Sequence, residues 1–328
     1  MEHLLFTMNA ILPILLPVLL GYFLRRINFF KDEFLVLCNK FVFNVLIPIL
    51  LFKNLYLANL NEIDLAFVGF ASGSILALFF IGMIVVAFVP DKKQKGVMLQ
   101  ASFRSNYAII GIPLATMLGG EEAGAAASVV AAATVPLFNI LAVIALTIYD
   151  KEDGEKILIS SILKKIVRNP LIIGVFCGLS TCFIFMGIDN LGGNINAFLN
   201  NDLTFVPKTI NSLANLATPL ALIVLGGRFE FKAVKRLWKQ LVVSTILKLA
   251  IVPAFFLTIA YFLGFDSKIE FGILIALFAT PIAVSSVPMA MQMKQDDELA
   301  GQIVVWTSAL SAFSLFVIIL LCSILGRL

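Results

Sequence analysis

Long apolar stretches make up most of this chain, and short polar or charged stretches separate them. Ten of the apolar stretches have the length of about 20 residues that an α-helix needs to cross a bilayer. They are residues 4–24, 34–55, 65–89, 97–118, 123–148, 169–188, 207–226, 241–264, 269–293 and 299–325. The pattern predicts an all-α polytopic membrane protein with ten transmembrane helices.

The composition excludes a soluble globular protein. Hydrophobic residues make up 60% of the 328 positions, charged residues make up 13%, and the mean hydropathy is +1.02. Soluble domains are about half apolar and about one quarter charged. The first apolar stretch begins at Leu4 with no basic region before it and no small-residue cleavage site after it. We therefore interpret it as a first span and not as a signal peptide.

The positive charges predict how the chain is inserted. Of the 24 Lys and Arg residues, 17 lie in the loops that follow odd-numbered spans, and four lie in the even loops and the two tails. Cytoplasmic loops are the basic ones, so both termini are expected outside a cell membrane. With five spans in each half, the halves must be inserted in opposite orientations. We expect a first repeat at 1–149, a charged cytoplasmic linker at 150–168 and a second, inverted repeat at 169–328.

Two of the apolar stretches contain residues that interrupt a helix. The fourth span carries Arg104, Asn106, Gly111 and Pro113, and the ninth carries Pro281 and Pro288. Aligning Pro113 with Pro288 sets an offset of 175 residues and gives eight identities over positions 91–115. Broken backbone at membrane depth is tolerated where it lines a cavity. Interrupted spans in matching positions of two halves are the best sequence indication of a transporter's binding site.

Spans 2 and 7 share a weaker motif, an asparagine four residues before a proline. Asn44 precedes Pro48, and Asn215 precedes Pro219. The proline frees a carbonyl in the preceding turn, and the amide can compensate it or face a cavity. We predict Pro48 and Pro219 as hinge or scaffold positions and Asn44 as a candidate substrate contact.

Two cations are predicted inside the membrane. Arg104 lies in the fourth span and Lys248 in the eighth, each about 10 Å deep at 1.5 Å per residue. No Asp or Glu lies clearly inside a span. Cations without counter-ions are costly at this depth, and the N-termini of broken helices add partial positive charge. A carboxylate substrate is therefore expected, with Arg104 and Lys248 compensating its charge. The alternative for both is snorkelling to the interface.

The remaining candidates are polar groups and helix breakers around the two interruptions. We predict substrate contacts from Asn106, Gly111, Pro113, Asn139, Pro281, Ser285, Ser286 and Pro288. Asn106 could instead bond the opposite broken backbone, the two serines their own helix, and Asn139 a neighbouring helix. His3 is the only histidine, and the four cysteines lack metal-binding spacing. The sequence thus predicts no metal, no cofactor and no enzymatic activity.

These features together resemble the auxin efflux carrier family, and specifically its short bacterial members, which are often described as malonate or malate permeases. The resemblance rests on the span number, the Asn106, Gly111 and Pro113 motif, and the prolines in spans 2, 7 and 9. It implies a crossover fold like that of the bile-acid symporters, with spans 1, 2, 6 and 7 as scaffold and spans 3–5 and 8–10 as a moving bundle. The second crossover proline falls on Pro288 or Pro281, so a symmetrical two-asparagine site is not expected.

The predicted function is secondary active transport of a small mono- or dicarboxylate by an elevator-like movement. A proton, taken up by the substrate or by Lys248, is the expected coupling ion rather than sodium. The alternatives are a sodium-coupled bile-acid-type symporter and a membrane ligand sensor without turnover. The basic residues are distributed as loop anchors, so nucleic acid is not an expected partner. Membrane lipid is an expected partner, and the apolar face of the scaffold is compatible with a homodimer.

Overall fold

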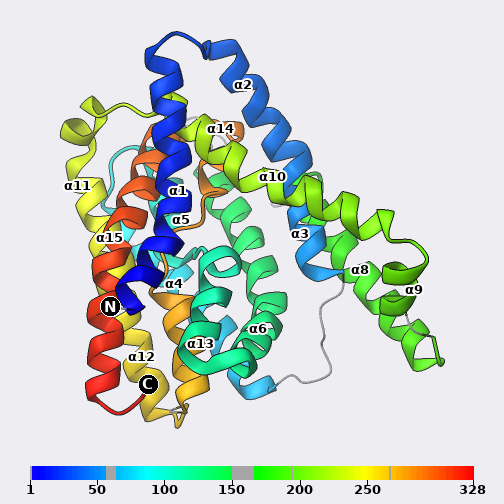
Figure 1. Ribbon diagram of the computed structural model, residues 1–328. Coiled ribbons are helices and arrows are strands. Elements are labelled where there is room, and N and C mark those ends of the chain that lie inside the picture. Colours follow the sequence, from blue (N-terminus) through cyan, green and yellow to red (C-terminus); the bar gives the residue numbers. More distant parts are fainter. Residues whose placement is uncertain (1, 57–63, 150–165, 194, 266) are drawn as a thin grey trace.

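The computed structural model describes residues 2–56, 64–149, 166–193, 195–265 and 267–328 (Figure 1). Their regular structure is helical, with no strand in these ranges. The helices are α1 (Glu2–Arg26), α2 (Asp32–Phe41), α3 (Ile47–Leu55), α4 (Leu65–Ala87), α5 (Lys92–Phe103), α6 (Ile112–Ile148), α8 (Pro170–Asn190), α9 (Ile195–Asn201), α10 (Phe205–Arg228), α11 (Lys232–Ile246), α12 (Val252–Phe262), α13 (Lys268–Phe278), α14 (Ser286–Gln292) and α15 (Asp297–Ile324). Most of the predicted linker, residues 150–165, lies outside the described residues.

Seven helical runs in the described part of the chain are long and apolar enough to cross a membrane. They are Asp32–Leu55, Leu65–Ala87, Lys92–Ile148, Pro170–Asn190, Phe205–Arg228, Lys232–Phe262 and Asp297–Ile324. The run Lys92–Ile148 has 57 residues, more than twice the roughly 20 residues of one crossing. It is interrupted after Phe103 and kinks at Gly120, whose φ is +81°. The protein is thus an all-helical, multi-pass membrane protein.

Polar residues between the apolar stretches determine where several helices begin. The side chains of Asp64, Asp91, Asn169 and Asp296 accept backbone N–H bonds at the starts of α4, α5, α8 and α15. Ser267 and Glu270 form a reciprocal capping box at α13. These bonds satisfy donors that have no partner within the helix.

Three proline residues each follow a π-helical turn. The turns are η1 (Val42–Leu46), η2 (Tyr107–Gly111) and η3 (Leu247–Ile251). The prolines occupy the second position of the helix that follows each turn, and they are Pro48, Pro113 and Pro253. Proline lacks an N–H and crowds the carbonyl four residues earlier. The residue before each proline donates instead to the carbonyl five residues back, which widens the turn.

Two helix pairs pack at very short distance through glycine. In the α1–α10 pair, a Cβ at Gly226 would lie 1.9 Å from the Val18 carbonyl oxygen. In the α3–α8 pair, a Cβ at Gly174 would lie 2.6 Å from the Pro48 carbonyl oxygen. Only glycine permits such backbone approach, which is typical of helix packing in membranes.

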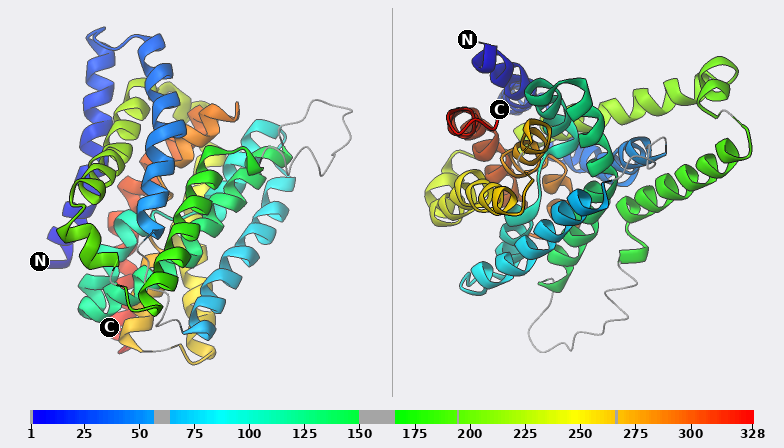
Figure 2. Two further views of the ribbon diagram at one scale, coloured as in Figure 1. Left: turned by 90° about the vertical axis from the view of Figure 1, so that its right-hand side faces the viewer. Right: turned by 90° about the horizontal axis from the view of Figure 1, so that it is seen from below.

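The helices fall into two groups with the interrupted helices between them. In Figure 1, α2, α3 and α8 lie on one side, and α11, α12 and α15 lie on the other. Helix α13 packs along α6, α4 along α5, and α11 along α15. Helix α1 packs mainly on α10 and also contacts α15. Helix α1 begins and α15 ends at the same end of the bundle (Figures 1 and 2).

Candidate functional site

The two interrupted helices touch each other at their breaks. Helix α5 ends at Phe103, and three non-helical residues follow before η2; residues 279–285 separate α13 from α14. The backbone N–H of Asn106 donates to the Pro281 carbonyl oxygen at 2.8 Å. The hydroxyls of Ser105 and Thr280 also form a hydrogen bond. The breaks in the two helices therefore cross in direct contact.

Arg104 is buried at this crossing, with 2% of its surface exposed. Its Nη2 donates to Asn139 Oδ1 at 2.9 Å and to Ser285 Oγ at 2.7 Å. Its Nη1 contacts Gln100 Oε1 and Met289 Sδ. All of these partners are neutral, so the guanidinium has no counter-ion among the described residues.

The network around Arg104 joins three parts of the chain. Gln100 belongs to α5, Asn139 to α6, and Ser285 precedes α14. The side chain of Asn139 is itself oriented, because its Nδ2 donates to the Val135 carbonyl at 2.8 Å. The guanidinium therefore points into the crossing and does not snorkel to the membrane interface.

Asn106 supplies a free donor at the crossing, next to Arg104. Its Nδ2 is buried and has no hydrogen-bond partner among the described residues. A bond to the opposite break was the alternative role for Asn106. The backbone N–H makes this bond, so the side chain is not needed for it. A buried donor without an acceptor is unfavourable unless a ligand or water satisfies it.

A cavity of about 70 Å³ lies beside these donors, which is space for a few water molecules. Its polar lining consists of Asn54, Arg104, Ser105, Asn106, Asn139, Thr218 and Ser285. Its apolar lining includes Leu51 of α3, Phe138 of α6 and Ala221 of α10. Its described lining includes the buried cation Arg104 and the buried, unpartnered amide of Asn106 and contains no acidic residue, which favours an anion with an apolar portion.

The predicted site residues separate into two groups. Arg104, Asn106, Asn139 and Ser285 line the cavity together. The other predicted residues do not line it: Gly111, Pro113, Pro281, Ser286, Pro288, Lys248, Pro48 and Pro219. Gly111 acts on packing, because a Cβ there would lie 2.5 Å from the Tyr107 ring and 3.0 Å from the Ala276 carbonyl. Lys248 is buried within η3.

Asn44, predicted from the sequence as a candidate substrate contact, does not line the cavity. Its side chain is exposed, and its Nδ2 donates to the Lys40 carbonyl at 2.8 Å. The asparagine therefore bonds to its own helix, within the π turn that Pro48 requires. Its counterpart Asn215 accepts a bond from Lys53 Nζ at 3.0 Å, between α10 and α3.

Four neutral polar residues of the site were not predicted from the sequence: Asn54, Gln100, Ser105 and Thr218. Gln100 is fully buried and contacts Arg104 from one turn earlier on α5. The spacing of four residues was a usable signal, because such residues share a helix face. Asn54 and Thr218 come from α3 and α10, which only the tertiary structure brings to the crossing.

Comparison with known proteins identifies the family. A protein named uncharacterized transporter from Methanocaldococcus jannaschii is 25% identical over 320 residues, 95% of this chain and 97% of the relative. A second protein of that description, from Methanothermobacter thermautotrophicus, is 26% identical over 315 residues, 94% of this chain and 95% of the relative. The names point to transport rather than to catalysis. Residues 6–319 match the family described as membrane transport protein, so the chain belongs to this family, which includes the auxin efflux carriers that its motifs resemble.

Proposed function

We propose that this protein is a secondary active transporter of a small organic anion, a mono- or dicarboxylate that binds at the crossing of the two broken helices. The observation that carries this proposal is buried Arg104, which has only neutral partners and lines a cavity together with the free Asn106 amide. A carboxylate would supply both the missing counter-charge and the missing acceptor.

An inverted repeat is supported by the contacts at the crossing. Ser105 bonds Thr280, and Asn106 bonds Pro281, so the partners in both pairs are 175 residues apart. The same offset aligns the two halves of the sequence. Equivalent residues of two related units contact each other only close to their two-fold axis. We infer that such an axis passes through the crossing and relates two five-span halves, 1–149 and 169–328.

The position of the cavity suggests how the anion would move. Helices α3 and α10 form one wall, and the crossing with α6 forms the other. We assign α1, α2, α3, α8 and α10 to a scaffold, and α4–α6 with α11–α15 to a transport bundle. The substrate then lies on the seam between them, and sliding of the bundle would expose it to either side of the membrane, in an elevator-like cycle.

Proteoliposome flux tests this function. Labelled malate, malonate and acetate are offered with and without an inside-alkaline pH gradient, and separately with a sodium gradient. We expect saturable uptake by the parent that responds to pH and not to sodium, and loss of uptake in Asn106→Ala. Asn44→Ala, which changes an amide outside the cavity, is the matched control. Failure of the folded parent to move any anion would overturn the proposal.

A further inference from the structure

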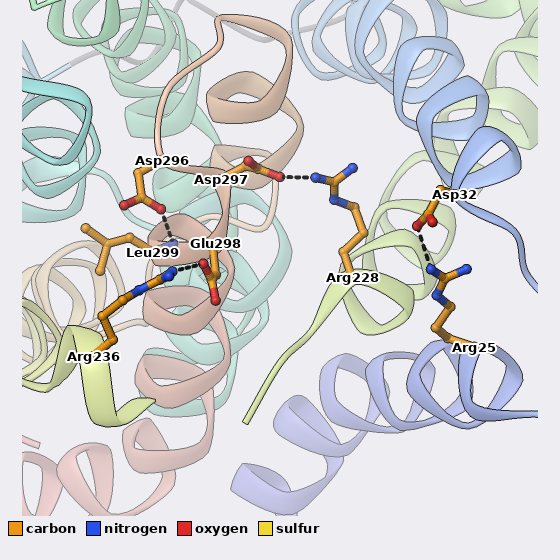
Figure 3. A network of polar contacts seen from close by, with 8 residues as sticks. All are labelled: Arg25, Asp32, Arg228, Arg236, Asp296, Asp297, Glu298 and Leu299. Atoms are coloured by element: carbon orange, nitrogen blue, oxygen red, sulfur yellow. Dashed lines mark hydrogen bonds and ion pairs between the residues drawn. The ribbon is translucent and has the colours of Figure 1, made fainter. Parts of the chain in front are cut away.

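Three ion pairs gather at one end of the molecule (Figure 3). Arg25 pairs with Asp32 at 2.7 Å, and Arg228 pairs with Asp297 at 2.8 Å. Arg236 pairs with Glu298. The three pairs have similar chemistry but join different elements, which makes them useful to compare.

Only one of these three pairs crosses the proposed seam. Arg25 and Asp32 join the end of α1 to the start of α2, both in the scaffold. Arg236 and Glu298 join α11 to α15, both in the bundle. The pair of Arg228 and Asp297 joins the last residue of α10 to the first residue of α15, and therefore connects scaffold to bundle.

A second bond reinforces this connection. Gln302 Nε2 on α15 donates to the carbonyl oxygen of Glu230, two residues beyond the end of α10, at 2.7 Å. Gln302 is buried, whereas Arg228 and Asp297 are partly exposed. The two contacts together close the gap between α10 and α15.

The residues that make these contacts line a second cavity of about 200 Å³. Its lining includes Val224 and Arg228 from α10, Met291 from α14, and Asp297 and Gln302 from α15.

The two cavities lie in series along one pair of elements. Helix α10 contributes Ala221 to the first cavity and Val224 to the second, about one helical turn apart. Ser285 at the end of the second break lines the first cavity, and Val287 at the start of α14 lines the second. The seam that holds the candidate site therefore continues to the end of the molecule where the ion pairs lie.

We propose that the second cavity is the inner mouth of the substrate pathway, and that the Arg228–Asp297 pair, with the Gln302–Glu230 bond, is a lock that holds this mouth closed. The proposal rests on the proposed function, because it takes the seam as the moving boundary. When the bundle slides, bonds across the seam must break and bonds within each part persist. A partly exposed ion pair suits such a lock, since it shifts the ratio of closed to open states by only about two- to fivefold.

Thiol labelling of the inner cavity tests the lock without requiring transport. In a chain whose four cysteines are replaced by serine, Val224→Cys places a reporter in the cavity. We expect Arg228→Gln to raise its labelling rate by a membrane-impermeant maleimide about two- to fivefold. Asp297→Asn, which breaks the pair from the other side, should do the same. Arg25→Gln and Arg236→Gln are the matched controls and should leave the rate unchanged.

A charge exchange and a salt series complete the test. Arg228→Asp combined with Asp297→Arg should restore the slow rate. High salt should raise the rate in the reporter protein but not in its Arg228→Gln form, because screening weakens an exposed pair. Equal rates in Arg228→Gln and Arg236→Gln, or fast labelling after the exchange, would overturn the lock. If the lock behaves as expected and no anion is transported, only the proposed transport function fails.

Discussion

Replacement of Arg104 by glutamine tests the origin of anion recognition most directly. The substitution removes both terminal nitrogens and with them the contacts to Gln100, Asn139, Ser285 and Met289. It also removes the cation from the cavity lining, where no other described residue is a cation. A hydrogen bond to a charged group contributes about 1.5–3 kcal/mol. At about 1.4 kcal/mol per factor of ten, we expect the affinity for a carboxylate to fall about 10- to 150-fold.

The folded state should survive this substitution better than binding does. In the absence of ligand, the buried guanidinium has no counter-ion among the described residues, which is itself unfavourable. Removal of the guanidinium relieves this unfavourable burial of charge. The same change leaves the neutral acceptor atoms of Asn139 and Ser285 without a donor. These opposing effects should leave the melting temperature in detergent changed by only a few degrees, so a loss of affinity can be measured on folded protein.

Equilibrium binding of the labelled anion that proteoliposomes transport best is the assay. Arg104→Lys should have intermediate affinity, because lysine keeps the charge but cannot hold the planar, forked geometry. Lys248→Gln is the matched control, since it removes a buried cation that does not line the cavity, and its affinity should stay within about threefold of the parent. Parent-like affinity in Arg104→Gln, or an equal loss in Lys248→Gln, would refute the assignment of Arg104 to the carboxylate.

Three further substitutions test the packing and the limits of the site. Gly226→Ala forces a Cβ to within 1.9 Å of the Val18 carbonyl oxygen. We expect it to lower the free energy of unfolding by about 1–3 kcal/mol, and with it the melting temperature. Gly69→Ala, whose Cβ would have nothing within 4 Å, is the control and should leave the melting temperature unchanged. Tyr107→Phe removes a buried bond of 3.1 Å to a carbonyl of α6 and should cost about 1 kcal/mol in chemical denaturation without loss of the fold. Asn44→Ala should leave anion uptake unchanged, because this amide is exposed; a large loss of uptake would show that the cavity extends beyond its present lining.

Much of the architecture could be predicted because the bilayer imposes simple requirements on the sequence. Apolar length predicts spanning helices, and seven helical runs of the described residues are long and apolar enough to cross a membrane, whereas ten spans were predicted. Polar residues between the apolar stretches mark where α4 and α8 begin. The breaks could also be located, because Gly111 and Pro113 together cannot continue a regular helix at membrane depth. Arg104 and Asn106 were identifiable because charged and amide side chains are rare there.

The site residues that the sequence did not reveal have a common physical property. Asn54 and Thr218 are neutral residues in apolar helices, and nothing local distinguishes a cavity-facing amide or hydroxyl from one that bonds its own helix. Asn44 is an amide that bonds its own helix, because its Nδ2 donates to the Lys40 carbonyl. The π turn that contains Asn44 also adds a residue to the turn, which rotates the following side chains away from the phase of a regular helix.

The two breaks contribute different groups at the crossing. The bond from Asn106 N–H to the Pro281 carbonyl has no reciprocal partner, because proline has no N–H to return it. The buried cation Arg104 and the buried, unpartnered Asn106 amide both belong to the first break. The second break contributes acceptors, namely the Pro281 carbonyl and the Ser285 hydroxyl that orients Arg104. If the protein binds an anion as proposed, the carboxylate should therefore face the first break, where the cation and the unpartnered amide lie.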